Sequence, residues 1–364
     1  MMHDERVFGL DLMRATAILL VVFWHCADAL AEILPGLWFP PHMDGVDLFF
    51  VLSGYLIGGI LLRYAEMATV PWHLRLLDFW QRRWLRTLPN YYLFLALNIV
   101  LVLGGCCGGL INRNTWVYAL FLQNAWKPVD LFFWESWSLV VEEWFYLLFP
   151  LILFSAMAIT GMAAKRTFLL LALLFIVAPM AMRFVLSADA PSLWHMEQGA
   201  RKLMITRLDA IGWGVLAAWC HASFPKCWSM ARWPLLLVGS SIVLGCAIAY
   251  GNDALAFSST HYFTLNALGM AMLLPALSAW RKAPRWGRSI TFISLVSYAL
   301  YLVHQPVRCF FNRWFVQEQE AGLLLPLLLY WAVCVALSWL VYRYWERPFM
   351  ALREKLSRRL GVAG

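Results

Sequence analysis

Residues 9–30 read GLDLMRATAILLVVFWHCADAL and carry two side chains that lipid normally excludes. The run is apolar and long enough to cross a bilayer, which takes about 20 residues. Arg14 lies near its start, and His25 lies deep in its second half. A charged group inside a span costs about 2.5–3.5 kcal/mol on insertion scales, so an ionisable residue there is by default a functional hypothesis.

The spacing of Arg14 and His25 places both on one side of the predicted helix. Eleven residues return to within about 20° of the same face and extend about 16 Å along the axis. We therefore expect one cavity to contain a cation near its cytoplasmic end and an imidazole well above it. The alternative is a structural histidine that hydrogen-bonds a neighbouring helix or Asp28, one turn further along.

The composition predicts an all-α, polytopic membrane bundle. Apolar residues make up 62% of the 364 residues, and charged residues make up 14%, against roughly 25% charged in a soluble domain. The net charge of +8 does not by itself indicate nucleic-acid binding, because Lys and Arg gather in the cytoplasmic loops of membrane proteins. The eight cysteines show no metal-ligand spacing, so we expect no metal site.

Apolar runs predict ten membrane spans. Their centres lie near residues 21, 54, 95, 147, 176, 213, 242, 270, 301 and 332. Placing both termini in the cytoplasm puts 21 of the 29 Lys and Arg residues in cytoplasmic segments, as the positive-inside rule requires. The stretch 105–135 is predicted to be an outer or re-entrant segment. Residues 1–350 form one predicted transmembrane domain, and 351–364 form a short basic cytoplasmic tail.

A second polar group is FWQRRWLRTLP, residues 79–89, which we interpret as an inner loop that enters the third span. It contains Arg82, Arg83 and Arg86. The segment could be an ordinary positive-inside anchor. Arginine forks beside aromatic rings are also what phosphate and adenine recognition require.

The stretch SWSLVVEEWFYLLFP, residues 136–150, opens the fourth span with two adjacent carboxylates. Glu142 follows Ser138 by four residues and therefore shares its face. Glu143 points elsewhere.

Three further stretches complete the set: GVDLFFVLSGYLI with Asp47, RLDAIGWG with Arg207, and SYALYLVHQPV with His304. Asp47 and Arg207 fit an ion pair that shapes the bundle, or contacts to an acceptor. His304 alone is more often a structural residue than a catalytic one.

These six stretches, in this order and followed by ERPF at 346–349, resemble the membrane acyltransferase type 3 family. Its members are bacterial integral-membrane O-acyltransferases of carbohydrates. The resemblance implies that Arg14 and His25 match the family's arginine-ten-residues-histidine motif. It also implies that Arg82, Arg83 and Arg86 match its arginine-rich inner loop and that Glu142 matches the glutamate of its serine-leucine motif. Gln305 departs from the aromatic residue that is common there.

The resemblance implies an enzyme of the bacterial inner membrane that uses acyl-CoA, with acetyl-CoA expected, as co-substrate and holds no permanent cofactor. His25 is the expected base or acyl carrier, assisted by Arg14 and by Glu142 or Asp28, and Arg82, Arg83 and Arg86 are expected to bind the donor. Asp47, Ser138, Arg207 and His304 are expected to contact a glycan acceptor. Some members carry an additional periplasmic domain; because Gly364 ends the sequence just after the tenth span, we expect direct transfer or a separate periplasmic partner.

Two other functions fit the same residues. A ten-span transporter or flippase would use the buried His and Arg as a proton relay and substrate clamp. A non-catalytic subunit of a glycan-export complex is the second alternative.

Overall fold

The chain folds into a bundle of helices. The computed structural model describes residues 6–27, 43–67, 69–127, 129–187, 199, 201–250, 255–312 and 324–359, and these contain helices and irregular connections without any strand. The all-α prediction is confirmed. Asp28, the predicted partner of His25, lies outside the described residues.

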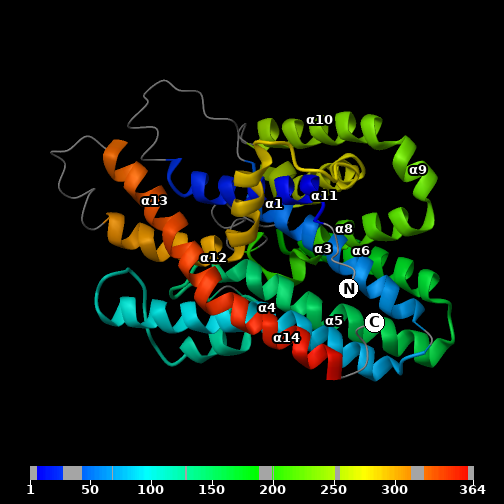
Figure 1. Cartoon of the computed structure of the whole chain (residues 1–364), viewed down its shortest axis with the longest axis horizontal. Coiled ribbons are helices and arrows are strands. Elements are labelled where there is room, and N and C mark those ends of the chain that lie inside the picture. The colour runs from blue at the N-terminus through cyan, green and yellow to red at the C-terminus, as the bar shows by residue number, and fades with distance from the viewer. Residues whose placement is uncertain are drawn as a thin grey trace.

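Figure 1 shows how the helices are arranged. Those of the described chain that matter here are α1 (Phe8–Trp24), α3 (Gly45–Glu66), α4 (Trp72–Leu103), α5 (Ser136–Thr160), α6 (Ala164–Ser187), α8 (Leu208–Ser223), α9 (Pro225–Met230), α10 (Arg232–Tyr250), α11 (Leu255–Ala279), α12 (Gly287–Phe311), α13 (Leu324–Leu340) and α14 (Arg347–Arg359).

Each of the ten predicted span centres falls inside one of these helices. Within the described chain, eight helical stretches are long and apolar enough to cross a membrane. The protein is therefore a multi-pass membrane protein. Helices α1 and α8 have 17 and 16 residues, below the usual span of about 20, so the count of ten spans and the side of each terminus stay predictions.

The arginine-rich segment is helical, and its interpretation as a loop was wrong. Helix α4 begins at Trp72 and continues through Arg82, Arg83 and Arg86 past Pro89. Residues 72–88 contain neither Gly nor Pro, so nothing in them breaks a helix. The stretch 105–135 is irregular apart from the short 3₁₀ helix η1 (Thr115–Leu120), as expected for a segment that does not span.

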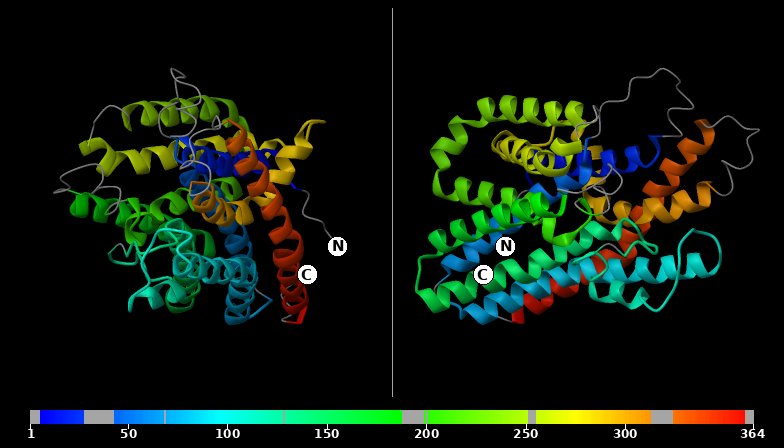
Figure 2. Two further views of the ribbon diagram at one scale, coloured as in Figure 1. Left: turned by 90° about the vertical axis from the view of Figure 1, so that its left-hand side faces the viewer. Right: turned by 180° about the vertical axis from the view of Figure 1, so that it is seen from behind.

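Helices α3 and α8 pack closely because both carry glycine at the crossing point. A Cβ atom on Gly54 or on Gly214 would overlap the backbone of the other helix. Small residues permit this approach between membrane helices. The pair forms the centre around which α1, α6 and α11 are arranged, as Figure 2 shows from two further sides.

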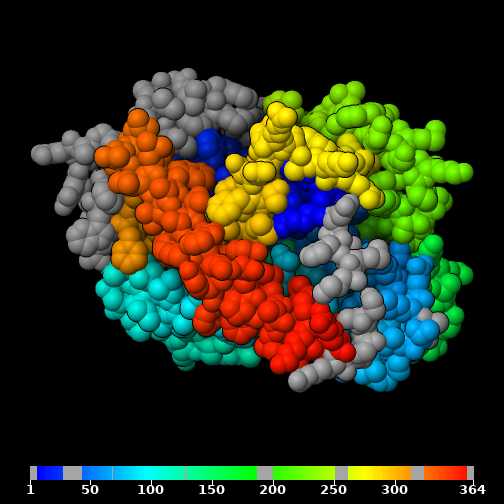
Figure 3. Space-filling view, in the orientation of Figure 1, coloured from blue at the N-terminus to red at the C-terminus, as the bar shows by residue number. Residues whose placement is uncertain are grey.

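Helices α13 and α14 are joined through a π-helical turn, η5 (Val341–Glu346), into one long rod. Figure 3 shows this rod as a ridge that crosses one face of the molecule. Its last part, α14, packs along α4. Arg82 donates to Glu354 and to Ser357 there, at 3.2 and 3.0 Å.

Asp47 and Arg207 form an ion pair in the core between α3 and α8. Both side chains are fully buried, and Asn266 donates a hydrogen bond of 3.0 Å to Asp47. Beside it, Arg183 pairs with Asp209 at 2.6 Å, again with both side chains fully buried. Of the two interpretations of Asp47 and Arg207, the structure therefore favours a bundle-shaping ion pair.

Candidate active site

The described residues enclose a cavity of about 950 Å³ among α1, α3, α4, α5, α8 and α12. Its charged lining residues are Arg6, Arg14, Arg63, Arg83, Arg86, Asp11, Glu142 and Glu346. Five cations against three carboxylates leave an excess of positive charge, which attracts anionic ligands into a cleft of low dielectric constant. This cavity is the candidate binding site.

Arg14 lines the cavity and is held in place from α12. Its Nη1 lies 3.3 Å from Ser294 Oγ and 3.6 Å from Asp11 Oδ1. Asp11 also accepts from Arg6 at 2.6 Å and from Ser294 at 2.8 Å. Because Asp11 is shared by two arginines, the group keeps a net positive charge that faces the cavity.

The three arginines of α4 separate into two kinds. Arg83 and Arg86 line the cavity. Arg82 does not, because its guanidinium lies on α14 beside Glu354. Periodicity alone does not separate them, because Arg82 and Arg86 are four residues apart and share a face of the helix; Arg82 is instead held by Glu354 and Ser357 of α14.

Ser138 and Glu142 line the cavity together, and Glu143 does not, as the helical spacing predicts. Glu142 lies beside the hydrogen bond of 2.8 Å between Ser53 Oγ and Tyr146 Oη. It is within electrostatic range of Arg86 and Arg83.

Two hydroxyls on facing helices, those of Ser138 and Tyr301, lie in the wall of the cavity. Ser138 Oγ and Tyr301 Oη are 2.7 Å apart, and the Tyr301 hydroxyl donates to the carbonyl of Glu135, also at 2.7 Å. The Tyr301 ring centre lies 5.7 Å from that of His304. His304 in turn lies 4.9 Å from His25. The rings of Tyr301, His304 and His25 therefore form a chain that leads away from the cavity wall, although neither histidine lines the cavity itself.

The tautomer of the neutral His25 ring follows from a side-chain hydrogen bond. Its Nδ1 lies 2.7 Å from the carbonyl oxygen of Val21. A carbonyl only accepts, so Nδ1 carries the hydrogen and the neutral ring keeps its lone pair on Nε2. Nε2 is the nitrogen that a general base or a nucleophile needs. The His25 carbonyl accepts from Arg308 at 3.0 Å, which joins the end of α1 to α12.

His304 is fully buried, and neither of its ring nitrogens has a hydrogen-bond partner of normal geometry among the described residues. A buried polar group usually finds a partner. The ring lies directly beside that of His25, with 4.9 Å between the ring centres.

Several cavity residues carry no signal that a single sequence reveals. Tyr301, Tyr146 and Glu346 lie inside stretches that carry the family resemblance, but nothing in their spacing assigned them a role. Glu346 is buried and accepts from Asn90 at 3.1 Å. Only the packing of α12, α5 and η5 around α4 brings these groups to the cavity.

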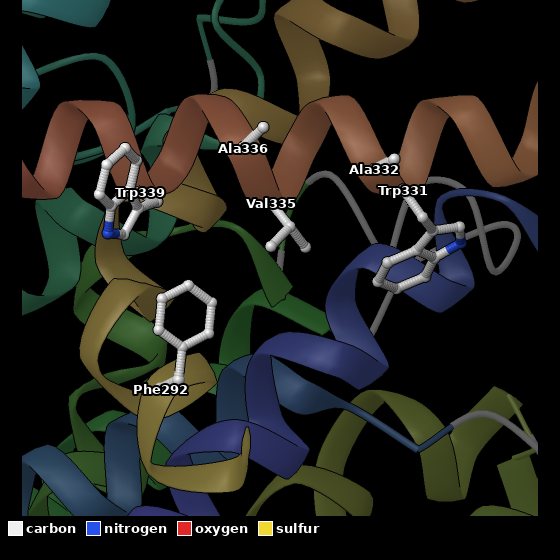
Figure 4. A pocket seen from close by; sticks show the side chains of 6 residues that line it. All are labelled: Phe292, Trp331, Ala332, Val335, Ala336 and Trp339. Carbon is white, nitrogen blue, oxygen red and sulfur yellow. The ribbon is translucent and has the colours of Figure 1, made fainter. Parts of the chain in front are cut away.

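A second pocket of about 700 Å³ lies between α12 and α13 (Figure 4). Its lining residues are Phe292, Trp331, Ala332, Val335, Ala336 and Trp339. Trp331, Val335 and Trp339 project from α13 toward the side of α12 and α1. None of the six titrates, so this pocket offers no acid–base chemistry.

Comparison with known proteins assigns the chain. A family model described as an acyltransferase domain matches residues 7–343, nearly the whole chain. The protein belongs to the acyltransferase type 3 family. Arg14 and Glu142 line the cavity described above, and His25 lies outside it, beyond Tyr301 and His304.

Among curated relatives of this acyltransferase, a protein of Staphylococcus aureus strain COL that is designated an O-acetyltransferase is 26% identical over 94% of this chain and 57% of its own length. The protein named O-acetyltransferase OatA, from strain NCTC 8325 of the same species, is 24% identical over 85% of this chain and 52% of its own length. The chain thus spans little more than half the length of these relatives. No solved structure matches it significantly.

Proposed function

We propose that this acyltransferase moves an acetyl group from acetyl-CoA to a hydroxyl of a cell-surface or exported glycan, across the bacterial inner membrane. One observation carries the proposal: Tyr301 lines the arginine-lined cavity and is one ring contact from the His304–His25 pair. The acetyl group is suggested by the names of the relatives.

The cationic end of the cavity suits the donor. Coenzyme A carries several phosphate charges on a nucleotide and a long, neutral pantetheine arm. Arg83 and Arg86 offer planar forks that bind phosphate oxygens in pairs, and Arg14 and Arg63 add charge. Arg82, which we expected to join them, is engaged by Glu354, and we leave it out of the donor site.

The reactive thioester must then reach His25. Arg14 and His25 are separated by about 16 Å along α1, a distance that an extended pantetheine arm covers. In the proposed path the arm passes the Ser138–Tyr301 hydroxyl pair, which separates the cavity from the histidines. The side chain of Tyr301 has to turn aside for the thioester to arrive.

Transfer to an alcohol requires a base, because a hydroxyl is a weak nucleophile at its own pKa. In one course, Nε2 of His25 takes the acceptor's proton as the oxygen attacks the thioester carbonyl; the C–S bond breaks, the new C–O ester bond forms, and the proton passes to the departing thiolate. In the other, Nε2 attacks the thioester carbonyl first, the C–S bond breaks, and CoA leaves as its thiolate. The acceptor oxygen then attacks the acetyl group, the bond between that group and Nε2 breaks, and the hydroxyl proton passes to the thiolate. Both courses give an ester and free CoA.

A labelling experiment tests the function. Membranes that contain the protein are incubated with acetyl-CoA labelled in the acetyl group, and the label is followed into glycan as an alkali-labile ester. Incorporation that the His25→Ala variant lacks is the expected result. Movement of glycan across the membrane without labelling would instead favour the flippase alternative.

A further inference from the structure

A flat aromatic platform forms part of the wall of the arginine-lined cavity. Tyr55 on α3 and His221 near the end of α8 both line it. Tyr55 Oη and His221 Nδ1 are 2.7 Å apart, and their ring planes differ by 5°. The two rings are therefore joined edge to edge into one continuous surface.

Trp228 of α9 supports this platform. Its ring lies parallel to both others, within 8° of His221 and 3° of Tyr55, with ring centres 4.9 and 5.9 Å away. The indole nitrogen donates to Ser278 at 3.2 Å, which fixes its orientation. Trp228 does not line the cavity, so we place it on the side of the two rings away from the ligand.

The space near the platform is built from small side chains. Gly59, Ala218, Ala222 and Pro225 line this part of the cavity. A Cβ atom on Gly59 would meet no atom within 4 Å. His221 itself is exposed, so a planar group can reach its ring.

A cation that can bind phosphate, Arg63, lies on the same helix as Tyr55. Arg63 follows Tyr55 by eight residues on α3, which is about 12 Å along the helix, and it also lines the cavity. A ligand with a planar base at one end and phosphates next to it fits this arrangement of rings and cation. Trp80 and Trp84, the aromatic neighbours of the arginine segment, instead stack on each other at 5.7 Å and do not line the cavity.

We propose that the Tyr55–His221 platform, supported by Trp228, binds the purine base of the donor nucleotide by stacking. This inference rests on the proposed function, because the donor is taken to be acyl-CoA. It adds the place of the adenine and the residues that hold it; Tyr55 lies in the stretch GVDLFFVLSGYLI, whereas His221 and Trp228 lie outside the stretches that carry the family resemblance. A base stacks on such a surface through its π face and needs no specific hydrogen bond.

Binding measurements on the full chain in detergent or nanodiscs test the proposal. The ligands are CoA, adenosine 3′,5′-bisphosphate, and 4′-phosphopantetheine, which lacks the nucleoside. We expect His221→Ala to weaken the binding of CoA and of the bisphosphate by about tenfold, the low end for one stacked base. We expect His221→Phe, which keeps a flat ring, to bind both within about twofold of the wild type.

The affinity for 4′-phosphopantetheine distinguishes a loss of stacking from general damage to the cavity. This affinity should be unchanged in His221→Ala, as should the thermal unfolding midpoint. Equal loss of all three ligands would show that His221 only shapes the cavity and would overturn the platform. If the wild type binds CoA and His221→Ala binds it equally well, the proposal that the platform stacks the base is wrong, while the proposal that the cavity binds the donor is retained. If the wild type binds neither CoA nor the bisphosphate, the donor itself is wrong.

Discussion

The imidazole rings of His25 and His304 lie 4.9 Å apart, centre to centre, at an angle of 52°. They come from α1 and α12, which are nearly 280 residues apart in sequence. His25 has one ring nitrogen committed to the Val21 carbonyl, whereas His304 has both free of normal hydrogen bonds to the described residues. Under the proposed function, His25 therefore performs the chemistry and His304 assists it.

Replacing His25 with Ala should abolish acetyl transfer and leave a folded, membrane-inserted protein. The reason is the loss of the Nε2 lone pair on which both proposed courses depend. His73→Ala is the matched control, because His73 is exposed at the start of α4, and it should keep wild-type activity. Activity of His25→Ala within a few fold of the wild type would exclude His25 as base or carrier.

Replacing His304 with Phe tests the second histidine. The ring is kept and its nitrogens are lost, so the packing against Tyr301 and His25 should survive. We expect kcat to fall at least about tenfold, within the usual range for a group that assists proton transfer, while the KM for acetyl-CoA stays within about twofold. An unchanged kcat would show that His304 only fills space.

Replacing Arg83 and Arg86 together with Gln should weaken CoA binding by at least about tenfold, because each charge-assisted contact to phosphate contributes about 1.5–3 kcal/mol. Arg82→Gln is the control on the same helix, since Arg82 faces α14. Calorimetric titration of the three proteins with CoA makes the comparison. If Arg82→Gln loses as much affinity as the double variant, the cavity is not the donor site.

The Asp47–Arg207 pair should contribute to folding and not to transfer. Asp47→Leu leaves a fully buried guanidinium without its carboxylate, which typically costs about 3–5 kcal/mol of unfolding free energy. Removing both charges with Asp47→Leu and Arg207→Met should recover most of that loss. Thermal unfolding in detergent measures both. A double variant no more stable than Asp47→Leu alone would contradict this account.

Glu135, just before α5, should make the protein less stable as the pH rises. Burial raises the pKa of its carboxyl from 4.5 to about 8. Between these values folded Glu135 binds more protons than unfolded Glu135. Its contribution to the unfolding free energy is therefore fully present below about pH 4.5 and is lost toward pH 8, by at most about 1.4 kcal/mol per pH unit.

The Glu135→Gln variant lacks the titrating carboxyl and therefore isolates the effect of its protonation on the unfolding free energy. Relative to the wild type, it should gain stability at pH 8 compared with pH 5. Parallel pH profiles for wild type and Glu135→Gln would show that Glu135 is ionised in the folded protein.

The sequence alone predicted the features that depend on local chemistry. Apolar runs predicted a helix at each of the ten centres, because a membrane segment must satisfy its own backbone hydrogen bonds. Helical periodicity put Ser138 and Glu142 on one face and Glu143 on another, and the structure agrees. The energetic cost of burying an ionisable group in a membrane identified His25, Arg14, Asp47 and Arg207 as candidate functional residues from the sequence.

Only the tertiary structure decided how these groups are paired. It brought His304 to His25, Tyr301 to Ser138 and Tyr55 to His221, since such contacts depend on which helices pack together, and periodicity within one helix does not specify its neighbours. It also turned Arg82 away from Arg83 and Arg86, because the partner on α14 lies 272 residues further along the chain. One continuous helix replaced the predicted loop because the breaking residue, Pro89, is tolerated within a long membrane helix whose neighbours restore the lost contacts.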